Sequence, residues 1–138
     1  MKLFFDTSAL IKRYFNEPGS GQVNGLLTEA DDIAVSIICL PEMISTLQRL
    51  VREKKISREL YAILKAEILK DIEDMEVVTL DPLVIGRSVE CLENSAVRAI
   101  DALHVACSLV VEAELFISAD LDQLKAAKQA GLKVTSIN

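Results

Sequence analysis

Five short apolar segments divide the chain, and a pattern with helical spacing follows each of the first four. They are residues 2–5, 33–37, 77–80, 115–118 and 134–137. Short strands joined through helices pair in parallel, because a parallel connection needs a crossover long enough to hold a helix. This alternation predicts an α/β fold, a three-layer α/β/α sandwich around a central, mostly parallel five-stranded sheet.

Apolar residues three and four positions apart predict the helices between these strands. Pro41 stands at a plausible first helical position, Ser57 can cap a helix, and Asp81-Pro82 is a cap followed by a helix-opening proline. The predicted helices are residues 8–15, 22–30, 40–54, 58–75, one from 82, 99–111 and 121–130.

The chain has 138 residues and no repeat, low-complexity tract or linker, which predicts a single domain over residues 1–138. Its 51% hydrophobic residues argue against disorder. Asp6 interrupts the first apolar stretch, so no signal peptide is expected, and no apolar run approaches the ~20 residues of a membrane span. We therefore expect a cytoplasmic protein without a membrane partner.

The net charge of −6 argues against a protein that holds nucleic acid over a broad basic surface. It does not exclude an enzyme that meets a phosphodiester through a bound metal. Cys39, Cys91 and Cys107 form no C-x-x-C pair, and the chain has a single histidine. A zinc site is therefore not expected, and the cysteines are interpreted as free buried thiols.

Two acids follow predicted strands at the edge where parallel sheets gather functional groups. Asp6 comes directly after residues 2–5, and Asp120 stands two residues after residues 115–118. Each could simply cap the helix that follows it. If the two strands are adjacent in the sheet, however, their ends would bring both carboxylates together.

Two further acids stand on predicted helices. Glu42 lies in a first helical turn, where the helix dipole alone favours a carboxylate, and heads a polar row with Thr46, Arg49 and Glu53. Asp101 shares one side of its otherwise apolar helix with His104 and Ser108. That side could face solvent, although it lacks the Lys and Arg usual on a solvated face.

Carboxylates that converge on one concavity cannot all stay ionised without a compensating charge. A divalent cation supplies that charge, and oxygen ligands favour Mg²⁺ or Mn²⁺ over zinc. Such a site typically activates a water and neutralises charge on a phosphodiester.

Four motifs in order resemble those of the PIN-domain nucleases, especially the VapC-like toxins of toxin–antitoxin pairs. They are "LFFDTSAL", "SIICLPEMIS", "AIDALHVACSL" and "LFISADLDQL". Together they span essentially the whole chain. Pro41 directly before Glu42 departs from the family pattern and bears on the direction of that side chain.

The resemblance implies a role for particular residues. The acids that would bind metal and act in catalysis are Asp6, Glu42, Asp101 and Asp120. Ser8 and Ser118 match hydroxyl positions that order ligands and metal waters. Asp122 is either a further contributor or a surface residue, and His104 is interpreted as a packing or hydrogen-bonding residue.

The resemblance also implies a function: a Mg²⁺- or Mn²⁺-dependent endoribonuclease, the toxin of a toxin–antitoxin pair. Its partners would be RNA (tRNA, rRNA or mRNA), an antitoxin and a second copy in a homodimer. Because basic residues are few, the alternative is a catalytically weak or inactive PIN-fold module that binds protein or RNA. A phosphatase with Asp6 as nucleophile is a third hypothesis, but Ser8 stands where such enzymes carry a second Asp.

Overall fold

The computed structural model describes residues 1–138, and its centre is one five-stranded sheet in which every neighbouring pair is parallel. The strand order is β3-β2-β1-β4-β5, so the first strand of the chain lies in the middle. The strands are β1 (Lys2–Phe5), β2 (Asp32–Ser36), β3 (Glu76–Val78), β4 (Leu115–Ser118) and β5 (Val134–Ser136). The predicted α/β fold with five strands is confirmed, and the sheet is wholly rather than mostly parallel.

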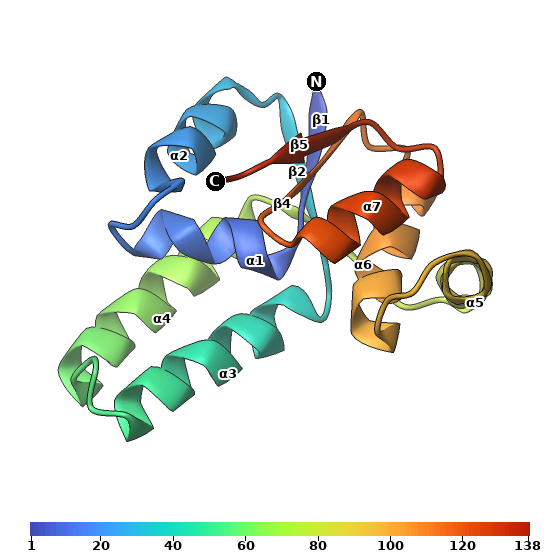
Figure 1. The fold of residues 1–138 in the computed structure, drawn as a ribbon. Coiled ribbons are helices and arrows are strands. Elements are labelled where there is room, and N and C mark those ends of the chain that lie inside the picture. Colours follow the sequence, from blue (N-terminus) through green and yellow to red (C-terminus); the bar gives the residue numbers. More distant parts are fainter.

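Helices cover both faces of this sheet, as the sandwich prediction requires. In Figure 1, α1 to α4 lie to one side of the strands and α5 to α7 to the other. None of the helices has the length and apolar composition needed to cross a membrane. They are α1 (Thr7–Leu10), the 3₁₀ helix η1 (Ile11–Tyr14), α2 (Ser20–Glu29), α3 (Cys39–Arg52), α4 (Arg58–Glu73), α5 (Pro82–Asn94), α6 (Ala99–Val110) and α7 (Leu121–Gln129).

Alternation along β1 divides the interior into two cores. Leu3 and Phe5 are buried against the α1–α4 side, whereas Phe4 is buried against the α5–α7 side. Phe4 stacks on Phe116 of β4, with ring centroids 5.7 Å apart. Successive side chains of a strand point to opposite faces, so a central strand between two helical layers must be apolar throughout.

Two predicted helix starts are confirmed in detail. Ser57 caps α4 by accepting a hydrogen bond from the Leu60 amide at 3.0 Å, and Asp81 caps α5 by accepting one from the Val84 amide at 3.0 Å. Each satisfies a backbone N–H that has no partner inside the helix.

Two local expectations were wrong. The helix expected over residues 8–15 is split into α1 and the tighter turn η1, and Pro41 is the third residue of α3 rather than its first. A proline is tolerated throughout a first turn, because none of those amides has an intrahelical acceptor. Its position therefore marks a helix start only to within a few residues.

Candidate active site

Two of the predicted acids lie at the carboxyl ends of adjacent central strands. Asp6 follows β1 and Asp120 follows β4, and these strands pair with Phe5 opposite Ile117. Each acid is also the N-cap of the next helix: Asp6 accepts from the Ala9 amide, and Asp120 accepts from two amides at the start of α7. The capping and site interpretations of these acids are therefore compatible.

Asp6 is fully buried and accepts hydrogen bonds on both carboxylate oxygens. Its Oδ1 accepts from the Ala9 amide at 2.9 Å and from Ser8 Oγ at 2.8 Å, and its Oδ2 accepts from Ser118 Oγ. Burial raises the pKa of Asp6 above its ordinary value, although the bonds from Ser118, Ala9 and Ser8 oppose the rise. The two serines named from the sequence thus both contact this acid.

Glu42 is bound from two different elements. Thr7 Oγ1 donates to its Oε1 at 2.6 Å, and His104 Nε2 lies 2.6 Å from the same oxygen. Because a carboxylate only accepts, the imidazole donates through Nε2. Burial raises the pKa of Glu42, but the bonds from His104 and Thr7 outweigh it and hold the pKa below its ordinary value.

Asp101 is buried at the first turn of α6 and accepts three hydrogen bonds. Arg98 donates through Nε to Oδ2 at 3.2 Å and through one terminal nitrogen to Oδ1 at 3.3 Å. The amide of Gln123 on α7 donates to Oδ1 at 3.2 Å. Gln123 also gives its backbone N–H to Asp120 at 3.1 Å, so one residue contacts two of the acids.

The Arg98 guanidinium lies within the field of three acids. Hydrogen bonding to Asp101 raises the pKa of Arg98, and the negative charges of Asp101, Asp120 and Glu42 raise it further. A charge interaction of this kind falls off over several ångströms in a partly exposed site. Asp101 therefore contacts this cation, and Asp120 and Glu42 act on it through their charges, although the three acids belong to different elements.

The polar side of α6 faces inward. Asp101, His104 and Ser108 are all buried, so the alternative of a solvent-facing stripe is wrong. Nδ1 of His104 and Oγ of Ser108 have no hydrogen-bond partner among the protein atoms. The helix thus buries all three polar residues, and His104 hydrogen-bonds to Glu42, in line with the role that the sequence suggested.

Asp122, the extra acid in the fourth motif, is exposed. Its backbone amide donates to Asp120 at 2.9 Å, and its carboxylate makes no hydrogen bond or ion pair. This placement favours the surface alternative for Asp122.

The donor set suits a hard cation, although no preformed cage exists. Nowhere in the chain do three or more His, Cys, Asp and Glu side chains form a ready group for a metal ion. Glu42 Oε2 and Asp120 Oδ2, however, accept no hydrogen bond, which leaves one free carboxylate oxygen on each. Carboxylate oxygens are the ligands that Mg²⁺ and Mn²⁺ prefer.

The sequence interpretation missed three residues that organise this site: Thr7, Arg98 and Gln123. Thr7 stands inside the first motif between Asp6 and Ser8, so its place beside the acid was a usable signal. Arg98 precedes Asp101 by three residues at the start of α6, so their i, i+3 pairing was a local signal as well. Only Gln123 needs the packing of α7 against α6 to reach Asp101.

Burial disfavours the thiolate form of all three cysteines. Burial raises the pKa of Cys39 to about 12, and the charges of Glu42 and Asp6 also raise it. Cys91 and Cys107 are likewise buried free thiols with raised pKa values. The prediction of free buried thiols is confirmed.

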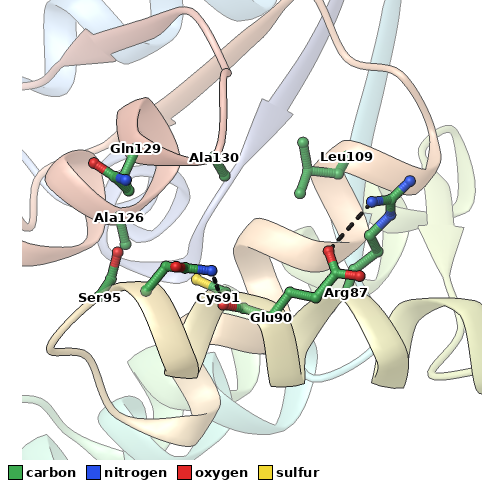
Figure 2. Close-up of a pocket in the computed structure, with 9 residues that line it drawn as sticks. Arg87, Glu90, Cys91, Ser95, Leu109, Ala126, Gln129 and Ala130 are labelled. Atoms are coloured by element: carbon green, nitrogen blue, oxygen red, sulfur yellow. Dashed lines mark hydrogen bonds and ion pairs between the residues drawn. The ribbon is translucent and has the colours of Figure 1, made fainter.

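A separate cavity of about 520 Å³ lies between α5, α6 and α7 and contains none of the four acids. Dashed lines in Figure 2 mark the interactions that Glu90 makes in this cavity. Arg87 pairs with Glu90 at 3.3 Å, and Asn94 donates to the Glu90 carbonyl at 2.8 Å. This cavity is distinct from the acid site.

Comparisons with known proteins agree with this architecture. The toxin–antitoxin complex from Klebsiella pneumoniae gives a TM-score of 0.72 at 15% identity, covering 97% of this chain and 96% of that one. VapBC2 from Rickettsia felis, bound to a promoter DNA fragment, gives 0.72 at 13% identity with 100% of both chains covered. VapC20 from Mycobacterium tuberculosis, a sarcin-ricin loop cleaving toxin, gives 0.69 at 16% identity, covering 94% and 95%.

Similarity at this level of identity establishes the fold. A comparison with curated proteins gives no match by sequence. The family model of the PIN domain matches residues 3–129, which is most of the chain and includes all four acids. The chain therefore belongs to the PIN domain family.

Proposed function

We propose that this protein is a metal-dependent endoribonuclease. The observation that carries the proposal is the gathering of four acids from four segments at one end of a parallel sheet. Glu42, Asp101 and Asp120 act on one guanidinium. Asp6 follows β1, which pairs with β4, the strand that ends before Asp120. Open parallel sheets place their active sites at this edge.

The charge balance of the site favours a divalent cation. Four carboxylates face one guanidinium and the imidazole of His104. An excess of negative charge in a partly buried site is unfavourable unless a cation compensates it. We propose that Asp6, Glu42, Asp101 and Asp120 hold Mg²⁺ or Mn²⁺, through the free oxygens of Glu42 and Asp120 among others.

The bound ion would polarise a water and neutralise charge on the phosphodiester. The side chains of the protein orient the acids that would hold this ion. Ser8 and Ser118 hold the Asp6 carboxylate in one orientation, and His104 and Thr7 do the same for Glu42. Ligands fixed by outer hydrogen bonds bind metal more tightly than mobile ones.

We further propose that the protein acts as the toxin of a toxin–antitoxin pair. Structures of similar fold include toxin–antitoxin complexes and a toxin that cleaves the sarcin-ricin loop. By analogy, the substrate is RNA, whether tRNA, rRNA or mRNA, an antitoxin protein is the partner, and two copies form a homodimer in the cytoplasm. Fold-level analogy suggests these partners and does not identify the RNA.

Cleavage of labelled RNA with Mn²⁺ tests the proposal. The parent protein should cut the RNA, chelation with EDTA should stop the reaction, and Asp6→Asn and Asp101→Asn should each abolish it. Asp122→Asn, which changes an exposed acid in the same region, is the matched control and should cut like the parent. Equal cleavage by all four proteins would identify a contaminating nuclease and refute the assignment.

One observation supports the second candidate, a PIN-fold module that binds without cutting. Arg98 already donates to both oxygens of Asp101, so part of the negative charge is neutralised by the protein itself. Calorimetry separates the two functions: a protein that binds a partner tightly but shows no heat of Mn²⁺ binding would be the non-catalytic module.

A further inference from the structure

We propose that the turn between α3 and α4 is a second RNA contact, a basic groove that grips the phosphate backbone away from the acids. The identity of the ligand as RNA rests on the proposed function. The groove is formed by residues 48–61 and has a volume of about 860 Å³. The protein has a negative net charge, and binding of RNA phosphates needs a local positively charged surface, which this groove provides.

Positive charge is concentrated at this turn. Residues 49–58 contain five Lys and Arg residues and one Glu, which gives this segment a net charge of +4. Because the whole chain has a net charge of −6, the other residues together carry a net charge of −10. One third of the 15 basic residues therefore lies within ten positions. A local positive field on a negative body attracts polyanions to that one place.

Most of these cations have no acidic partner. Glu53 pairs with Arg49 at 3.8 Å and with Lys55 at 3.2 Å, and these are the only ion pairs at the turn. Arg52, Lys54 and Arg58 make no ion pair and are all exposed. Cations that neutralise no charge within the protein are available to neutralise phosphates, with release of counterions from the RNA.

An aromatic ring lies among the cations. Tyr61 lines the groove together with Arg52, Lys54, Lys55 and Arg58; it is half-buried and packs against the core with the rest of its ring. Single-stranded nucleic acids are bound by basic grooves in which bases stack on aromatic side chains. This combination favours a single-stranded RNA segment over an acidic peptide, which would use the cations but not the ring.

The groove and the acid site are joined by one helix. Glu42 lies in the first turn of α3 and Arg52 is its last residue, so the rise of 1.5 Å per residue separates them by about 15 Å. Figure 1 shows α3 running from the strand ends toward the turn. The polar row of α3, with Thr46 and Arg49, continues from Glu42 toward the end of the helix at the turn. An RNA strand a few nucleotides long can therefore contact both sites.

Binding of a fluorescein-labelled single-stranded RNA of mixed sequence tests this inference by anisotropy in EDTA, where no cutting occurs. The variant R52Q/K54Q removes two unpaired cations from the groove. The matched control K128Q/K133Q removes two exposed, unpaired lysines from the opposite edge of the sheet. We expect the groove variant to raise Kd about tenfold at low salt and to flatten the slope of log K against log salt by about 1.4, while the control changes Kd less than about twofold.

The outcomes separate this inference from the proposed function. A groove variant with the affinity and salt slope of the control would overturn the inference, even if the parent cuts RNA. Failure of the parent to bind the RNA at low salt would also overturn it and would leave an acidic protein as the candidate ligand. If RNA binding depends on the groove but Mn²⁺ supports no cutting, the groove stands and the nuclease assignment fails.

Discussion

Nε2 of His104 lies 2.6 Å from Oε1 of Glu42, and this contact ties α6 to α3 at the edge of the sheet. His104 is 1% exposed, so the bond is shielded from solvent on the imidazole side. Hydrogen bonds made inside a protein are stronger than the same bonds in water. The contact therefore stabilises the ionised form of Glu42 and orients it toward the site.

Glu42→Gln should reduce stability in a manner that depends on pH. The pKa of Glu42 is lower in the folded protein than its ordinary value of 4.5, so the folded state binds fewer protons than the unfolded state. Its contribution to stability is fully present above pH 4.5 and disappears as pH falls through the folded pKa. Urea unfolding should show the parent more stable than the variant at pH 7, with the difference shrinking below pH 4.5. A difference that stays constant down to low pH would contradict this.

Asp6→Asn should show the opposite pH dependence. Burial raises the pKa of Asp6 above 3.8, so the folded state holds its proton longer than the unfolded state does. The parent then loses stability relative to the variant as pH rises from 3.8 to the folded pKa, by up to about 1.4 kcal/mol per pH unit. Asparagine keeps the N-cap. We expect the variant to melt at a higher temperature than the parent at pH 7 and at a similar temperature at low pH. A lower melting temperature at pH 7 would refute the cost assigned to burial.

Ser118→Ala should destabilise the fold by about 1–3 kcal/mol, because it removes a hydrogen bond to a fully buried carboxylate. Ser136→Ala on β5 is the control, since its hydroxyl makes only a 3.5 Å contact with the terminal residue. Equilibrium unfolding in urea at pH 7 measures both. Equal effects of the two substitutions would mean that the bond to Asp6 contributes little.

Asp120→Asn and Asp122→Asn form a matched pair for activity. Asparagine can still cap α7 at position 120, and at position 122 it replaces an exposed side chain. Only Asp120 lies within the acid site. If Asp120 is a metal ligand as proposed, its substitution should reduce RNA cleavage on the order of 100-fold or more, whereas Asp122→Asn should stay within about twofold of the parent. Initial rates at saturating Mn²⁺ measure the effect. Comparable losses in both variants would place Asp122 in the site.

Mn²⁺ should raise the melting temperature of the parent without any substrate. Binding to the native state alone stabilises it by about 2.7 kcal/mol at roughly a hundredfold excess over Kd. Differential scanning fluorimetry with and without EDTA measures the shift. Asp101→Asn should show little of it, and an Asp122→Asn control should show it in full. An equal shift in Asp101→Asn would place the cation elsewhere.

The fold could be predicted because its signals are local. Residues 2–5 and 115–118 are apolar runs of the right length, and they form β1 and β4 with the predicted bounds. Ser57 and Asp81 mark helix starts by capping chemistry that needs no tertiary information. The break between α1 and η1 has no such signal, since the apolar pattern continues through it.

The site could be predicted only in part, because its organisation depends on packing. The positions of Asp6 and Asp120 could be predicted because both acids come after predicted strands. The absence of Lys and Arg from the polar side of α6 indicated that this side is buried. The sequence interpretation overlooked Arg98, although an i, i+3 ion pair at a helix start is a local signal. Gln123 reads as an ordinary helical residue until α7 lies against α6.

The central position of β1 has a consequence for synthesis of the protein. Asp6 and Ser118 are 112 residues apart in sequence, yet they bond to each other across neighbouring strands. Translation proceeds from the amino end, so the first acid leaves the ribosome long before the strand that completes its surroundings. Contacts between such distant segments form late in folding. A nascent chain therefore carries no assembled acid cluster until β4 has been made, which would keep the proposed RNA-cutting activity away from the message and the ribosome that are producing the protein.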